Sequence, residues 1–171
     1  SIEATMGLWG SSFAVFVHGV QTDTAARWAS LFYFGITFGR FLSGFVTLKL
    51  NNRQMVLLGE ALITAGVIMI MLPFGKAGFL TGFILSGIGC APIFPSLLHE
   101  TPANFGEKHS QSVMGLQMAS AYIGTTFIPP LFGALASKTS YLLLPFFTGA
   151  VLVIMFIMVE LLNKRVNEKN K

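Results

Sequence analysis

Charged residues are scarce in this sequence. Only 11% of its 171 residues are Asp, Glu, Lys or Arg, whereas a globular domain carries about 25%. A chain with so few charges cannot cover a water-exposed surface, and 53% of its residues are hydrophobic. Segments 77–98 and 141–159 contain no charged residue, and each approaches the ~20 residues needed to cross a bilayer. The sequence therefore predicts an integral membrane protein surrounded by a lipid bilayer.

Several kinds of chemistry lack the residues they need. With Cys90 as its one cysteine, the chain forms no intramolecular disulfide, and the surrounding apolar run favours a packing role for this thiol. There is no Gly-rich phosphate loop ending in Lys and Ser or Thr, which argues against an ATP-driven motor. The three histidines lie at span ends or in loops without metal-ligand spacing, and no Ser–His–acid set can be assembled at membrane depth. We expect no enzyme, no metal site and no cofactor.

Apolar runs alternate with short polar turns and predict an all-α, polytopic membrane helix bundle of six transmembrane helices. The predicted spans cover residues 1–20, 25–48, 55–74, 79–98, 113–136 and 141–162, followed by a solvated tail at 163–171. Residues 99–112 form the longest polar connection. Two groups of three spans share length and rhythm, a pattern typical of a 3+3 inverted repeat. Because the first span looks truncated, we expect a larger bundle of which this is one part.

The net charge of +4 is explained by membrane topology, since the basic residues flank the apolar spans. If six spans alternate, eight basic residues lie on the side of the tail and three lie on the other. Loops rich in Lys and Arg stay in the cytoplasm. We therefore expect a multi-pass protein of the plasma membrane with a cytoplasmic C-terminus, and no nucleic-acid partner.

Two prolines, Pro92 and Pro95, interrupt the apolar run of the fourth span. An interior proline removes a backbone hydrogen bond and clashes with the preceding turn. In a membrane, the freed backbone groups must meet other helices or a water-filled cavity. We therefore expect a break in the helix toward the cytoplasmic half, where Pro92 and Pro95 would shape an inner gate.

Four ionisable residues within or beside the spans are candidates for function. An ionisable group at membrane depth is costly and by default marks a pathway, a proton relay or an ion pair. Glu3 fits that description or, as the alternative, is solvated near the chain end. Arg40 either pairs with a carboxylate or extends its charge to the interface. Glu60 is the expected partner of Arg40 or Arg53, and we assign these three a gating or structural role.

Small residues flank Arg40 at Gly35, Gly39 and Ser43, spaced by four. That spacing places them on one helix face and allows another helix to approach closely.

Polar and aromatic side chains within the spans could contact a solute. Gln117 and Tyr122 in the fifth span offer an amide and a hydroxyl, while the neighbouring threonines are better explained as helix contacts. Trp9, Phe94 and Tyr122 could offer aromatic faces to a sugar ring. Helix packing is the alternative for each of them.

Four motifs, in order, cover essentially the whole chain and resemble the C-terminal six-helix half of a major facilitator superfamily transporter, in its fucose-permease-like branch of sugar porters. The most specific is the run Ala91-Pro92-Ile93-Phe94-Pro95 after Gly87 and Gly89. The others are Glu3-x5-Trp9, Gly39-Arg40-Phe41-Leu42-Ser43-Gly44 with Asn51-Asn52-Arg53, and Gly124-x4-Pro129-Pro130-x2-Gly133.

The resemblance implies one half of a twelve-helix secondary transporter that works by alternating access, with the N-terminal six-helix half as its missing partner. The cargo would be a small polar solute, a sugar or related metabolite, in many relatives moved together with a proton. It also implies that Glu3 binds solute or proton. Arg40 and Arg53 resemble the degenerate second copy of a loop motif that stabilises the outward-facing state in this family. Asn51 and Asn52 stand where that motif has an acidic residue, so its usual charge relay is not expected. The alternatives are a non-transporting membrane interaction module and a half-size transporter acting as a dimer.

Overall fold

The computed structural model describes residues 1–169, and all regular structure in that range is helical. The elements are α1 (Ile2–His18), α2 (Thr22–Val46), α3 (Asn52–Met71), α4 (Gly75–Phe105), α5 (Glu107–Lys138), the 3₁₀ turn η1 (Tyr141–Leu143) and α6 (Leu144–Lys169). In the described part of the chain, α2 to α6 are long and apolar enough to cross a membrane. This confirms an all-α membrane bundle. Helix α1 has 17 residues, slightly below the usual crossing length, so a sixth span stays a prediction.

The connection predicted for residues 99–112 is wrong. Helix α4 continues to Phe105 and α5 begins at Glu107, so only Gly106 separates two helices of 31 and 32 residues. Gly106 has φ 77° and ψ 154°, a region of backbone space that is open essentially to glycine alone. The polar residues that suggested a loop instead extend both helices beyond their apolar spans.

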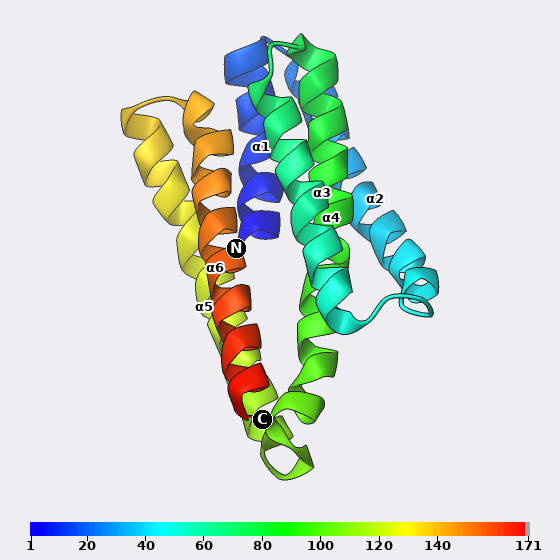
Figure 1. The fold of residues 1–171 in the computed structure, drawn as a ribbon. Coiled ribbons are helices and arrows are strands. Elements are labelled where there is room, and N and C mark those ends of the chain that lie inside the picture. Colours follow the sequence, from blue (N-terminus) through cyan, green and yellow to red (C-terminus); the bar gives the residue numbers. More distant parts are fainter. Residues whose placement is uncertain (170–171) are drawn as a thin grey trace.

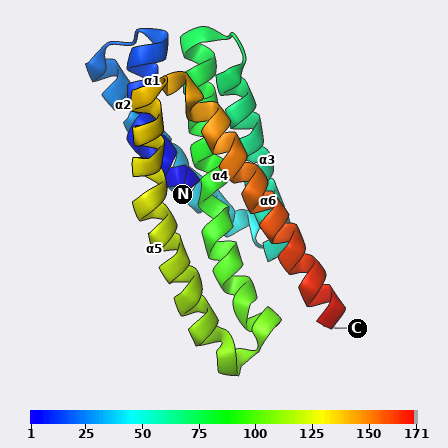
Figure 2. The same cartoon turned by 90° about the vertical axis from the view of Figure 1, so that its left-hand side faces the viewer.

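Helix α4 lies at the centre of the bundle, packed along α3 on one side and α2 on the other (Figure 1). Helix α5 runs antiparallel to α4 and is followed by α6, which contacts α3 (Figure 2). Helix α1 begins about halfway along the bundle and fills only its upper half in Figure 1. Its first turn therefore lies in the interior, between the α2–α4 layer and the pair α5 and α6.

Two helix pairs that involve α4, with α3 and with α2, approach closely through glycines. An added Cβ atom at Gly59 of α3 would lie 2.6 Å from the carbonyl oxygen of Gly89. Similarly, an added Cβ atom at Gly35 of α2 would lie 2.8 Å from the carbonyl oxygen of Ile84. Of the predicted face of Gly35, Gly39 and Ser43, the two glycines are thus confirmed as the surface on which α2 meets α4, since only small residues permit such contact. Ser43 lines a groove beside it.

The prolines do not break α4, contrary to the expectation from sequence. The helix contains Pro92, Pro95 and Pro102 and is continuous from Gly75 to Phe105. Pro92 cannot donate to the carbonyl of Ile88, four residues earlier. Gly39 of α2 lies against that carbonyl, because its added Cβ would be 2.8 Å from the Ile88 oxygen. The freed acceptor therefore faces another helix, which is the condition for tolerating proline inside a membrane.

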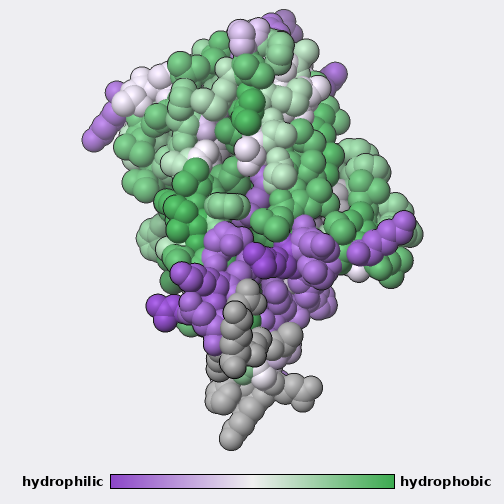
Figure 3. Space-filling view, in the orientation of Figure 1, coloured by the Kyte–Doolittle hydropathy of each residue, from purple (hydrophilic) through white to green (hydrophobic). Residues whose placement is uncertain are grey.

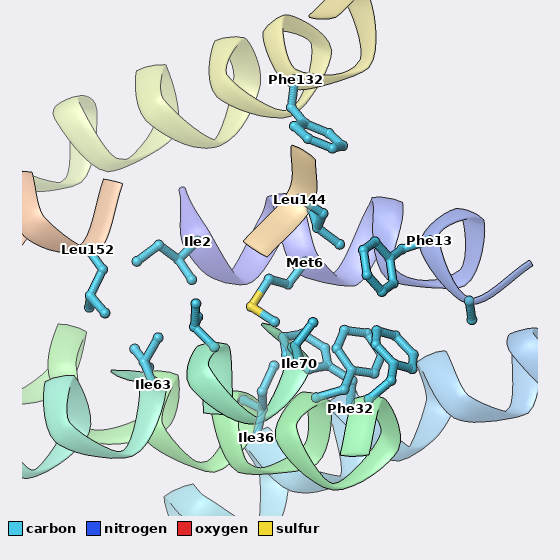
Figure 4. Packing of buried hydrophobic residues seen from close by; sticks show 14 of the residues in the cluster. Ile2, Met6, Phe13, Phe32, Ile36, Ile63, Ile70, Phe132, Leu144 and Leu152 are labelled. Carbon is cyan, nitrogen blue, oxygen red and sulfur yellow. The ribbon is translucent and has the colours of Figure 1, made fainter. Parts of the chain in front are cut away.

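The core gathers around α1, whose inward side chains meet residues from all the other helices (Figure 4). Phe13, Phe79, Phe83 and Phe32 form a column of stacked rings from α1 through α4 to α2, with centroid distances of 5.1, 5.1 and 4.6 Å. Outside this core, the face shown in Figure 3 is mainly hydrophobic, with hydrophilic residues gathered near the end of α6. A broad apolar surface ending in a polar zone suits a bilayer.

Candidate functional site

The first turn of α1 forms the wall of a cleft of about 480 Å³ that α2, α4 and α5 complete. Its volume falls within the range of small-molecule sites, roughly 300–1,000 Å³. The lining residues are Ser1, Glu3, Ala4, Tyr33, Arg40, Phe94, Met118, Ala121, Tyr122 and Thr125. We call this space the central cleft.

Two opposite charges meet in the central cleft. Arg40 Nη2 of α2 lies 3.9 Å from Glu3 Oε1 of α1, with side chains 62% and 41% exposed. A pair this long and this open contributes little to stability. Both groups can therefore exchange their mutual contact for a bound polar molecule. Arg40 has the carboxylate partner expected from sequence, although it is Glu3 rather than Glu60.

Hydroxyl and aromatic groups surround this charge pair. Tyr33 of α2 and Tyr122 of α5 line the cleft and are exposed, as is Phe94 of α4. Thr125 donates a 3.1 Å hydrogen bond to the Tyr122 carbonyl oxygen and also lines the cleft. A charge pair, three hydroxyls and aromatic surface together can bind a polar molecule that carries several hydrogen-bonding groups.

A second ion pair joins α3 to α6 at the end of the bundle where α6 ends. Arg53 Nη2 lies 3.5 Å from Glu160 Oε1. Glu60, two turns along α3 from Arg53, is only 4% exposed. Neither of its carboxylate oxygens has a hydrogen-bond partner among residues 1–169. The expectation that Glu60 pairs with Arg40 or Arg53 is therefore not met, because each arginine has a different carboxylate beside it.

A family model described as Major Facilitator Superfamily matches residues 4–171. The chain belongs to this superfamily. Members of this superfamily are membrane transporters, so the chain is a multi-pass membrane transporter. No curated protein and no solved structure matches the chain.

In this transporter, a groove of about 320 Å³ adjoins the central cleft. It is lined by α2, by α4 and by the first turn of α3. Pro92 and Pro95 line it together with Ser43 and His99. Arg40 lines both spaces. The two prolines therefore lie beside Arg40, at a place where α4 borders a groove.

Trp9 lies outside the central cleft and the other described cavities. Its indole Nε1 donates a 2.9 Å hydrogen bond to the carbonyl oxygen of Pro129 on α5. Its ring packs edge-on against Phe132 at 5.9 Å and lies close to the backbone of Gly133. These contacts fasten α1 to α5 and leave Trp9 as a packing residue in this conformation, which is the alternative that sequence left open.

Gln117 also lies apart from the charge pair. Its Oε1 accepts a 3.0 Å hydrogen bond from the Thr101 hydroxyl and so joins α5 to α4. The side chain lines a separate cleft of about 380 Å³, which shares Phe94 with the central cleft. Of the five predicted binding residues, the structure brings together Glu3, Phe94 and Tyr122.

Sequence reasoning did not single out Tyr33 or Glu160. Tyr33 precedes Arg40 by seven residues, which places both on one face of α2, so this spacing could have indicated it. Glu160 is a charged residue near the end of the last apolar span. Its presence alone could have suggested an ion pair but could not identify Arg53 as the partner.

Proposed function

We propose that this protein is a secondary active transporter that moves a small polar solute, a sugar or related metabolite, by alternating access. The central cleft carries the proposal, because it places a loose Glu3–Arg40 pair and tyrosine hydroxyls in the interior of a membrane bundle. A solute with several hydroxyl groups would replace the water and the weak ion pair with hydrogen bonds to charged groups, which are the stronger kind.

Glu3 is the proposed point of proton coupling. Its carboxylate can pair with Arg40 or take a proton, and a solute that occupies Arg40 favours the protonated form of Glu3 because the stabilising positive charge is then shared. Binding of solute and proton would thus support each other. The fucose-permease-like resemblance also supports solute binding or protonation at this position.

The wider assignment follows from the same resemblance and from charge topology. The chain would form the C-terminal half of a larger carrier, as a 3+3 repeat in which α1 is the first span. The tail would lie in the cytoplasm at the plasma membrane, since basic residues concentrate on its side. Arg53, Glu60, Pro92 and Pro95 would act in gating at that inner side.

Uptake by the full-length protein in proteoliposomes tests the proposal, with a panel of radiolabelled sugars and with or without an inward proton gradient. We expect at least one sugar to accumulate when the gradient is present. Glu3→Gln should lower its uptake roughly 10- to 100-fold, the equivalent of a charge-assisted hydrogen bond, and should abolish the response to the gradient. Asp23→Asn is the matched control, because Asp23 is exposed in the first turn of α2. Uptake by Glu3→Gln that still follows the gradient would reject the role of Glu3.

A further inference from the structure

Glu60 is a buried carboxyl group that the proposed solute site does not use. Its side chain belongs to α3, the residue is 4% exposed, and both oxygens lack a hydrogen-bond partner in the described part of the chain. Buried polar groups in proteins are normally hydrogen-bonded, and a buried charge is normally paired. An ionised Glu60 would violate both rules.

Among the residues that the structure describes, no basic side chain forms an ion pair with Glu60. From α6, Glu160 carries the same sign, and its contact with Arg53 places it on the face of α3 that also carries Glu60. Arg53, on α3 itself, is held 3.5 Å from Glu160. The carboxylate on this face of α3 is therefore already paired with the nearest arginine along the helix, and Glu60 has no part in that pair.

Helix α4 does not supply a positive partner either. At the level of Gly59 it presents the Gly89 carbonyl and the apolar side chain of Ile93. Lys76 lies in the first turn of α4 and donates to the Gly19 carbonyl oxygen. Cys90 lines a cleft with Ile63 and Glu3, and His99 lines the groove beside Pro92 and Pro95. The low-polarity surroundings favour the neutral form of a carboxylic acid.

We propose that Glu60 is a proton-binding site, separate from Glu3, that holds its proton while α6 covers it. Arg53 precedes Glu60 by seven residues, on the same face of α3 and about 10 Å along the helix axis. When the ends of α3 and α6 separate, water reaches Glu60 and Arg53 loses Glu160. Glu60 then releases its proton, and its carboxylate forms an ion pair with Arg53. The proposal that Glu60 holds a proton does not depend on the proposed transport function, whereas its link to helix separation rests on that function.

Infrared difference spectroscopy of the full-length protein in lipid nanodiscs tests the proton occupancy directly. In a Glu3→Gln background, which removes the other proposed proton site, we expect at neutral pH the carbonyl stretch of a protonated carboxylic acid, and adding Glu60→Gln should abolish it. Glu168→Gln is the matched control, because Glu168 is exposed on α6, and it should leave that band unchanged. A spectrum without the band, or a band that survives in Glu60→Gln, would overturn the proposal.

Glu160→Gln provides a second measurement that leaves Glu60 intact, in case Glu60→Gln does not fold. Removing the neighbouring negative charge makes ionisation of Glu60 easier, so the band should disappear at lower pH than in the wild type. A band with unchanged pH dependence would show that the two carboxyl groups do not communicate. Neither spectrum depends on uptake, so failure of the sugar assay leaves this test standing.

The link to helix movement is measured by spin labels at the exposed positions Leu58 of α3 and Arg165 of α6. In the wild type, the population with a long distance between labels should grow as pH rises. In Glu60→Gln, which stays neutral, the short distance should dominate at every pH. A distance distribution that changes with pH equally in both proteins would refute the link.

Discussion

Replacement of Gly59 by alanine should destabilise the bundle although it improves the local helix. The added Cβ would lie 2.6 Å from the Gly89 carbonyl oxygen and 2.6 Å from Cγ1 of Ile93. Since a close C–H···O contact needs about 3.3 Å between carbon and oxygen, α3 and α4 would have to separate by roughly 0.7 Å. Overpacking of this kind costs about 1–3 kcal/mol, while alanine gains about 1 kcal/mol over glycine inside a helix.

Gly44→Ala is the matched control for that experiment. Gly44 also lies in a helix, but an added Cβ there would meet no atom within 4 Å. It should therefore show only the gain of about 1 kcal/mol. The two variants should differ in free energy of unfolding by about 1–3 kcal/mol, the overpacking term alone.

Thermal unfolding of both purified variants in the same detergent measures this difference. Each kcal/mol corresponds to about 2–4 °C in Tm for a chain of this size, so Gly59→Ala should melt clearly below Gly44→Ala. If the two variants melt together, the α3–α4 approach is not as close as the contacts indicate. The role of glycine at that contact would then be wrong.

Two further perturbations address the helix contacts beside the cleft. Trp9→Phe removes the donor to the Pro129 carbonyl oxygen and should lower the free energy of unfolding by about 1 kcal/mol. The solute affinity in the uptake assay should stay unchanged. A large loss of affinity would show that Trp9 belongs to the solute site. Alanine at both Pro92 and Pro95 should slow transport while leaving Tm close to that of the wild type, since it restores backbone donors in α4. Wild-type uptake by that double variant would leave the prolines as packing residues.

The bundle was largely predictable from sequence because its evidence is local. Uncharged segments such as 141–159 mark helices by length and hydrophobicity, and the spacing of Gly35 and Gly39 marks a contact face. The segment 99–112 misled because polarity marks where a helix leaves the apolar layer, and it does not mark where the helix ends. Gly106 alone carried the signal for the turn.

The charge pairs were less predictable because pairing depends on which helices become neighbours. Sequence proximity favoured Glu60 as the partner of Arg53, whereas the structure places Glu160 beside Arg53 from 107 residues away. Trp9 shows the same limit, since its hydrogen bond reaches 120 residues along the chain to Pro129. A membrane carboxylate or indole in a sequence indicates that some partner is needed, and only the packing of helices selects it.

The contact between α2 and α4 connects the central cleft to the proline segment. Gly39 lies on the carbonyl of Ile88, which is free because Pro92 cannot donate to it. Arg40 is the next residue of α2 and borders both the central cleft and the groove beside the prolines. A change of bend in α4 at Pro92 would move the surface on which Gly39 rests and would shift Arg40 relative to Glu3. Because that charge pair is already loose at 3.9 Å, a small shift would suffice to make or break it, and in the proposed transporter the conformation of α4 and the occupancy of the cleft would then depend on each other.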